Sequence, residues 1–159
     1  MVRSSRSQRA LLAGLVVVLA VSAAAFVATA SAQLAWQQRD TIDFRPADYE
    51  LVDGDDPVLR VTFEVRNPTS VDARVRTGSL VVYDGDPAAG DALTVPRTER
   101  LEGDRDATVA AGETATVSLV ASVSPDTVEQ AQSAIDSGRA VPSGTFAVTV
   151  RGRSFQADV

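Results

Sequence analysis

The side chains that could do chemistry in this chain are carboxylates, arginines and hydroxyls, because its 159 residues include no histidine and no cysteine. Their absence removes the thiol nucleophile, the Ser–His–Asp relay, the histidine-ligated metal centre, the iron–sulfur cluster and the disulfide. It also removes a lipid-bearing cysteine. Oxygen ligation of a cation, acid–base work by paired carboxylates, and anion binding by arginine remain to be considered.

Two aspartate-rich stretches resemble fragments of a calcium loop. They are Asp53-Gly54-Asp55-Asp56 and Asp84-Gly85-Asp86. A complete loop supplies six or more oxygens at set positions, including a distant bidentate glutamate, and neither stretch does so. Turn residues on an acidic surface explain both, although two loops at one end of a domain could hold an ion jointly.

The segment around residue 100 offers the other two chemistries. Glu99 and Glu102 could in principle act as the carboxylate pair of a glycosidase, but we expect them to be solvated acids in a loop. The arginines could bind an anionic sugar or a lipid headgroup, but they are interleaved with acids, which favours surface ion pairs: Arg97, Arg100 and Arg105 among Glu99, Glu102, Asp104 and Asp106. We therefore expect no catalytic, cofactor-binding or metal-binding residues, and the sequence identifies no small-molecule substrate.

The charge composition indicates the surroundings of the protein. The chain has 15 basic and 21 acidic residues, a net charge of −6, which argues against a nucleic-acid partner. Every basic residue is arginine, and aspartate outnumbers glutamate. This composition favours adaptation to concentrated salt and a haloarchaeal source. A GC-rich genome is the alternative, but codon bias alone does not explain the acidic excess.

The first forty residues predict a membrane segment. Arg3, Arg6 and Arg9 are the only charges before Arg39, and residues 11–30 read LLAGLVVVLAVSAAAFVATA. A helix of that length spans about 30 Å, the hydrocarbon thickness of a bilayer. The positive-inside rule places residues 1–9 in the cytoplasm and the C-terminal part outside. Residues 10–32 would then be a single-pass anchor, with the bilayer as partner through residues 11–30.

A cleaved signal peptide is the main alternative. Ala30-Ser31-Ala32 fits the small-residue cleavage pattern, and cutting after Ala32 would give a secreted protein beginning at Gln33. The apolar run exceeds the roughly 7–15 residues usual for a signal peptide, which favours retention. A buried soluble helix is disfavoured because the segment is apolar all round. A pilin-like subunit is disfavoured because the segment lacks an early acidic residue.

Residues 33–40 read as a polar tether, in which Trp36 is expected at the membrane interface, and residues 41–159 read as the exported domain. Leu59, Val61, Phe63 and Val65 alternate with polar residues, which predicts a half-buried strand. Asn67-Pro68 ends that strand, because proline cannot donate to a strand ladder.

Further strands are predicted by the same alternation. They cover residues 42–52, an edge strand broken at Pro46; residues 71–83, with a bulge or bend at Gly78; residues 92–95; residues 115–123; and residues 145–150, with a bulge at Gly152 before Phe155. Phe63, Phe146 and Phe155 are expected in the core.

One short helix interrupts the strands. Ser124 and Pro125 suit its start, and Gly138 suits its end. Such a helix would cover an open end or edge of the sheets. The predicted fold class is all-β, an antiparallel β-sandwich of the fibronectin-III or immunoglobulin type with one short helix, preceded by the transmembrane helix.

The order of these features resembles the late-embryogenesis-abundant (LEA) type 2 domain, which includes the water-stress (WHy) domain, over roughly residues 41–157. The resemblance lies in the strand ending at Asn67-Pro68, the Asp84-Gly85-Asp86 turn, the Gly112-Glu113-Thr114 lead-in, the short helix, and the last strand from Gly144 to Gly152. It implies a fibronectin-III-like sandwich, an association with desiccation or osmotic stress, and no catalytic residues. A second resemblance is to CARDB-type adhesion modules. Residues 124–138 argue against it, because those modules generally lack a helix at that position.

These patterns together predict a non-enzymatic, membrane-anchored extracytoplasmic β-sandwich that serves as an envelope stress or interaction module. The alternatives are a structural or adhesion subunit of the envelope with an envelope protein partner, and a secreted sandwich. An enzyme that uses carboxylates and arginines is the remaining possibility.

Overall fold

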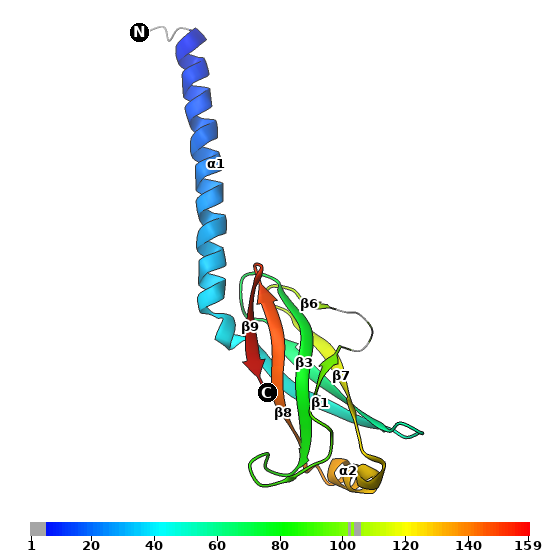
Figure 1. Cartoon of the computed structure of the whole chain (residues 1–159). Coiled ribbons are helices and arrows are strands. Elements are labelled where there is room, and N and C mark those ends of the chain that lie inside the picture. The colour runs from blue at the N-terminus through cyan, green and yellow to red at the C-terminus, as the bar shows by residue number, and fades with distance from the viewer. Residues whose placement is uncertain (1–5, 102, 104–105) are drawn as a thin grey trace.

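The computed structural model describes residues 6–101, 103 and 106–159, and within them it shows a long helix standing on a β-sandwich (Figure 1). The long helix is α1 (Arg6–Gln37), and a single 3-10 turn, η1 (Arg39–Thr41), leads from it into the first strand. The predicted fold class is confirmed: two antiparallel sheets, one short helix, and an N-terminal apolar helix.

Helix α1 is the one candidate membrane span among the described residues. The span covers Leu11–Gln37, and its most apolar 18 residues have a mean hydropathy of 2.7 and are not buried against the rest of the protein. The helix continues beyond the predicted anchor, so most of the segment expected to be a polar tether, residues 33–40, is helical. Ala35, near its C-terminus, is fully buried and belongs to the core of the sandwich.

The smaller sheet has three strands in the order β1 (Asp43–Val52), β2 (Val58–Arg66) and β7 (Thr114–Ser122). The predicted alternation is confirmed in β2, where Leu59, Val61, Phe63 and Val65 are all fully buried. Strand β1 lies at an edge, as expected, and its register with β2 shifts between Pro46 and Asp48. Proline and a bulge in an edge strand both discourage pairing with another chain.

The larger sheet is built on β3 (Ala73–Asp84) and β8 (Ala140–Val150), which pair along their whole length. Strand β9 (Arg153–Asp158) pairs with the other side of β8. Three short strands pair in succession with the remaining edge of β3: β6 (Ala107–Val109), β5 (Arg97–Arg100) and β4 (Asp91–Ala92). Strands β5, β6 and β9 were not expected from the sequence.

Stacked phenylalanines join the two sheets. Phe44 of β1 stacks on Phe146 of β8 with ring centroids 4.4 Å apart, and Phe63 of β2 meets Phe146 edge-on at 5.0 Å. Phe63 and Phe146 are fully buried, as predicted. Phe155 is not: it lies in β9, half-buried, beside Trp36.

Two glycines have roles other than the bulges expected of them. The register of β3 shifts between Val75 and Thr77, not at Gly78. A Cβ on Gly78 would lie 2.6 Å from Leu119 Cδ1, so this glycine makes room for the core. Gly152 lies in the two-residue turn between β8 and β9, where Arg151 and Gly152 both have positive φ, 50° and 79°.

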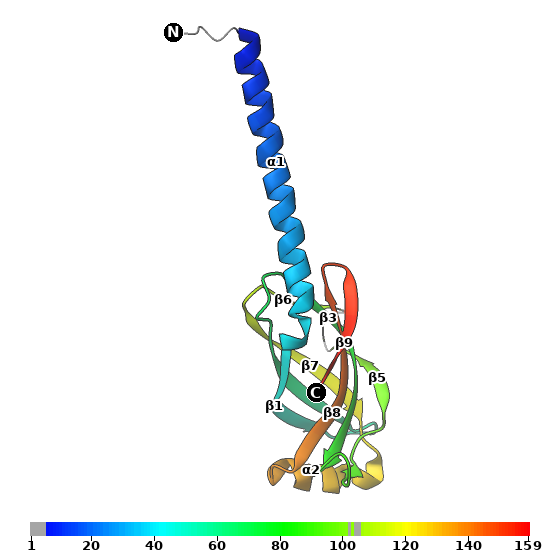
Figure 2. The same cartoon turned by 90° about the vertical axis from the view of Figure 1, so that its left-hand side faces the viewer.

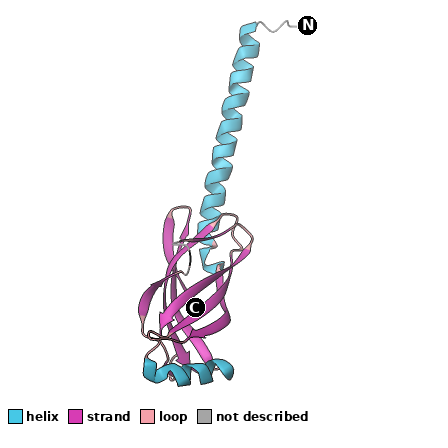
Figure 3. Ribbon diagram, turned by 90° about the vertical axis from the view of Figure 1, so that its right-hand side faces the viewer, coloured by secondary structure: helices cyan, strands magenta, loops and turns pink. Residues whose placement is uncertain are grey.

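The sandwich has a near end, next to α1, and a far end, opposite it. The near end, next to α1, is formed by residues 66–74, 107–114 and 150–153 (Figure 2). The far end is formed by residues 51–58, 84–91 and 123–140, and it carries the 3-10 turn η2 (Pro125–Thr127) and helix α2 (Val128–Asp136) (Figure 3). Ala131 and Ala134 of α2 are buried, so the helix covers an open end of the sheets, as predicted.

Candidate functional site at the junction of helix and sandwich

The far end gathers most of the acidic loop residues. Within its three segments the single arginine is Arg139, among the acids Asp53, Asp55, Asp56, Asp84, Asp86, Asp91, Asp126, Glu129 and Asp136. The two aspartate-rich stretches therefore do lie at the same end. Across the described residues, however, no three carboxylates come close enough together to hold a metal ion.

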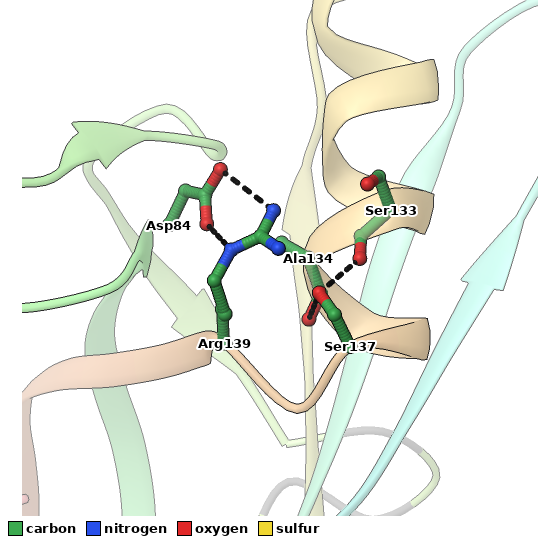
Figure 4. A network of polar contacts seen from close by, with 5 residues as sticks. All are labelled: Asp84, Ser133, Ala134, Ser137 and Arg139. Carbon is green, nitrogen blue, oxygen red and sulfur yellow. Dashed lines mark hydrogen bonds and ion pairs between the residues drawn. The ribbon is translucent and has the colours of Figure 1, made fainter.

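Asp84 instead forms an ion pair with Arg139 (Figure 4). Arg139 Nε donates to Asp84 Oδ1 at 2.7 Å, and Nη2 donates to Oδ2 at 3.4 Å. The C-terminus of α2 positions this arginine: Gly138 has a φ of +67°, and Arg139 N donates to Ala134 O at 2.8 Å. The hydrogen bond from Arg139 lowers the pKa of Asp84 below its ordinary 3.8. The pair fastens α2 to the end of β3.

A groove of about 680 Å³ runs between α2 and the end of β1. Asp53, Glu129 and Asp136 are its acidic lining, and Leu51 and Val128 are its apolar lining. Gln132 Nε2 donates to Asp136 Oδ1 at 2.8 Å, and Ser133 and Ser137 add hydroxyl groups to the lining. Elsewhere, burial raises the pKa of Tyr49 to about 12, which keeps this phenol neutral within the β1 face.

The arginine-rich segment 97–105 falls partly outside the described residues. Residues 102, 104 and 105 are not described, so the solvated state expected of Glu102 and the surface ion pairs expected of Arg105 stay predictions. The adjacent Asp106 lies 3.5 Å from Arg76 of β3, an ion pair at the surface. Leu101 is buried and bridges to Leu119 of β7, which closes the sandwich on that side.

Asn67 organises the near end. It is fully buried, and its Nδ2 donates to the carbonyls of Val71 at 2.8 Å, Val109 at 3.0 Å and Ala110 at 3.1 Å. Its Oδ1 accepts from Thr69 Oγ1 at 2.7 Å. One side chain therefore ties the end of β2 to the loop before β3 and to the end of β6. The Asn-Pro pair does more than end a strand.

Trp36 joins α1 to the sandwich. Its ring meets Phe155 of β9 edge-on, with centroids 6.0 Å apart. Two guanidinium groups lie over the same ring, Arg39 at 4.9 Å and Arg153 at 5.6 Å from the centroid. Arg39 Nη1 also donates to Trp36 O at 3.1 Å, which holds this arginine against the helix end. Trp36 is therefore a contact between the helix and the domain.

A pocket of about 540 Å³ opens beside this contact. One wall is a face of α1, and the other is the β8–β9 hairpin. The residues from α1 are Thr29, Gln33, Trp36 and Gln37, and those from the hairpin are Val150, Arg151 and Arg153. Within the described residues, neither Arg151 nor Arg153 has a carboxylate partner. Two arginines that have no carboxylate partner in the described part of the chain therefore meet an aromatic ring at this cavity.

The sequence offered only part of this site. Trp36 is expected at the membrane interface, but the sequence does not indicate Arg151 or Arg153, which flank a glycine expected to be a bulge. The usable signal is Gly152 itself: a glycine between two polar–apolar alternations also indicates a two-residue hairpin turn. A hairpin there would have predicted a second strand and a tip near α1.

The comparisons with known proteins bear on the fold. No family model matches the chain, and no curated protein matches it. Several solved structures resemble it, among them the following two. A crystal structure of a protein from Archaeoglobus fulgidus has a TM-score of 0.51 and 11% identity, and the match covers 74% of this chain and 91% of that one. The X-ray structure of the Northeast Structural Genomics Consortium target SoR45 has a TM-score of 0.47 and 15% identity, covering 74% and 81%.

At these identities the likeness concerns architecture alone. Because the TM-score of the SoR45 match is lower, the match to the Archaeoglobus fulgidus protein is the one used to compare folds. The chain is thus a β-sandwich domain preceded by a long apolar helix, with a fold shared by a protein from Archaeoglobus fulgidus.

Proposed function

We propose that this chain is a single-pass membrane protein that holds a non-enzymatic β-sandwich at the outer surface of the cell, with residues 1–9 in the cytoplasm. The observation that carries the proposal is helix α1, whose apolar residues 11–30 are all exposed. Exposing so large an apolar surface to water is strongly unfavourable, and a bilayer removes that cost.

The connection between helix and sandwich favours a retained anchor over a cleaved signal peptide. The bond after Ala32 lies within a continuous helix, and Ala35, three residues later, is fully buried. Trp36 then packs on Phe155 and two arginines. The helix is thus continuous with the folded domain, whereas a signal peptide is expected to end in an accessible small-residue segment.

The mature N-terminus tests this proposal. Cells that make the chain are separated into membrane and medium fractions, and the N-terminal peptide is identified by mass spectrometry. We expect an intact N-terminus in the membrane fraction, and a sandwich that external protease digests in whole cells. A fragment that begins at Gln33 in the medium would overturn the anchor, and a sandwich protected in whole cells would overturn the orientation.

The role we propose for the sandwich is protection or interaction at the envelope under osmotic or drying stress, as the resemblance to the late-embryogenesis-abundant type 2 domain implies. The acidic far end supports a surface adapted to salt. A strain lacking the chain is expected to lose viability on drying or osmotic shift, and to regain it when the chain is restored. Equal survival, or turnover of a substrate by the purified protein in an activity screen, would overturn this role.

A structural or adhesion subunit of the envelope is the second candidate, and the sheet edges favour it. In the described residues β9 is paired only with β8, whereas β1, paired only with β2, carries the proline and bulge that discourage pairing. Strand addition at such an edge is a common way of binding another chain. Concentration-dependent oligomers in high salt would support this candidate, and a strict monomer would exclude assembly through these edges.

A further inference from the structure

We propose that the pocket between α1 and the β8–β9 hairpin binds the phosphate group of an anionic lipid, in the leaflet from which α1 emerges toward the sandwich. The inference rests on the membrane anchorage proposed above and adds a ligand to it. Arg151 and Arg153 would contact the phosphate, and Trp36 would lie along the glycerol region of the lipid.

The height of the pocket matches a headgroup. Thr29, Gln33 and Trp36 line it from one face of α1, at helical spacings of four and three residues. Thr29 lies in the last turn of the apolar run that ends at Ala30. The pocket therefore begins where the hydrocarbon ends and extends toward the sandwich. This is the level of the phosphates and of interfacial tryptophans in a bilayer.

The charge of the pocket suits an anion. Among the described residues Arg151 and Arg153 lack a carboxylate partner, whereas Arg39 is already within 3.4 Å of Asp40. Arginine presents a planar fork of donors that matches phosphate oxygens. Gln33 and Gln37 add amide donors on the opposite wall. Arg153 is held in place by the Trp36 ring, so less side-chain freedom is lost on binding.

Arg151 has a backbone conformation that is unfavourable for arginine. Its φ is 50°, and Gly152 follows with 79°, the geometry of a hairpin turn that favours Asn-Gly. A side chain with a Cβ costs free energy in this left-handed region unless it is asparagine or aspartate. An arginine kept at such a position, with its head in a pocket, is consistent with a binding role.

The charges of the whole sandwich support the same orientation. The far end carries nine acidic residues and Arg139, whereas the near end holds Arg66, Arg74, Arg151 and Arg153 beside Asp72 and Glu113. An anionic membrane surface would attract the near end and repel the far end. At molar salt the Debye length is only about 3 Å, so direct contact with the phosphate would carry the binding there.

The binding test uses the full chain in micelles of a non-ionic detergent, titrated with a short-chain phosphatidylglycerol. Trp36 is the only tryptophan, so its fluorescence reports on the pocket without a label. The variants are Arg151→Asn, which suits the turn, and Arg153→Gln. The control is Arg45→Gln, which removes the same charge from β1, outside the pocket. Each titration is done at low and at molar salt.

We expect wild type and Arg45→Gln to bind phosphatidylglycerol equally, and each pocket variant to bind about tenfold more weakly, the loss expected from one charge-assisted hydrogen bond. Equal binding by Arg151→Asn and Arg45→Gln would overturn the inference. Inorganic phosphate alone is the second probe. If it binds as tightly as the lipid, the pocket is a free-anion site and the lipid assignment is wrong.

Insertion is measured separately, so that the two proposals fail in different ways. The chain is reconstituted into vesicles of phosphatidylcholine alone, which carries no net charge, and extracted with alkaline carbonate. Retention in the vesicles without a preference for phosphatidylglycerol in micelles would leave the anchor standing and remove the lipid site. Complete extraction would remove the anchor itself.

Discussion

At the scale of the residue, Asn67 shows how one buried polar side chain can fix a loop. It is fully buried and uses both ends of its amide, donating to three carbonyls and accepting from Thr69. Each hydrogen bond formed on folding replaces a hydrogen bond to water, so its net contribution to the free energy of unfolding is modest. Removing the Asn67 amide is different, because Val109 O loses this donor, whereas Val71 O keeps Thr69 Oγ1 and Ala110 O keeps the Glu113 N–H.

Replacing Asn67 with alanine should therefore destabilise the sandwich strongly. We expect Asn67→Ala to lower the free energy of unfolding by about 3 kcal/mol, because Val109 O loses its amide donor and the three segments that Asn67 joins are no longer held together. Ser70→Ala, an exposed change in the same loop, should leave it within about 0.5 kcal/mol. Urea unfolding of the protein in micelles gives both values, and similar midpoints for the two variants would contradict the role assigned to Asn67.

The ion pair of Asp84 and Arg139 predicts a pH dependence. The pKa of Asp84 is lowered in the folded protein by the hydrogen bond from Arg139, so its stabilising effect is present above 3.8, the ordinary value, and is lost as pH falls through the lowered pKa. Wild type should be more stable than Asp84→Asn at neutral pH, and the difference should vanish in strong acid. A difference that persists at pH 2 would show that the asparagine disturbs packing instead.

At the scale of the element, the sequence predicted the strands whose two faces differ most. Strands β2 and β7 bury one face and expose the other, so apolar and polar residues alternate along them. Strand β9 reads RSFQAD and has one large apolar residue, which is too little pattern to recognise. Strands β5 and β6 are four and three residues long, shorter than the window that periodicity needs.

The candidate site was less predictable than the fold, for a related reason. Trp36 and Arg153 are 117 positions apart in the sequence, and only the β8–β9 hairpin brings them together. Gly78 illustrates the same limit. A glycine inside a strand indicates either a bulge or a close approach, and only the position of Leu119 decides between them.

Gly78 gives a prediction about packing between the sheets. The Cβ of Gly78→Ala would lie 2.6 Å from Leu119 Cδ1 and 3.2 Å from Phe146, so Leu119 would have to move. We expect a loss of about 1–3 kcal/mol, the cost of overpacking a core. Gly54→Ala is the matched control, because nothing lies within 4 Å of its added Cβ. Thermal unfolding compares them, and equal melting temperatures would mean that Leu119 finds another rotamer without cost.

At the scale of the whole molecule, charge is distributed along the long axis. The far end is acidic, whereas the near end combines arginines with acids. Like charges close together oppose folding, and dissolved salt screens them. The same asymmetry that would orient the sandwich on an anionic surface therefore makes its stability depend on the solvent.

Salt should stabilise the sandwich. Between about 0.1 and 1 M sodium chloride the Debye length falls from about 10 to about 3 Å, and we expect the melting temperature to rise by about 5 °C. Replacing the hairpin acids Asp53, Asp55 and Asp56 with asparagine should reduce this rise. Calorimetry of the full chain in non-ionic micelles measures it. A melting temperature that falls with salt would argue for a GC-rich genome as the origin of the composition.

The even apolar surface of α1 has a last consequence, which concerns motion within the membrane plane. Residues 11–30 are exposed and apolar around the whole circumference of the helix, so the lipid tails meet the same surface from every side. In the single-pass arrangement that we propose, the bilayer would fix the tilt and depth of the helix but not its rotation about the membrane normal. In any ordered lattice of these molecules, contacts between sandwiches would have to set the orientation of each molecule about the membrane normal. Time-resolved polarisation would detect the loss of rotation.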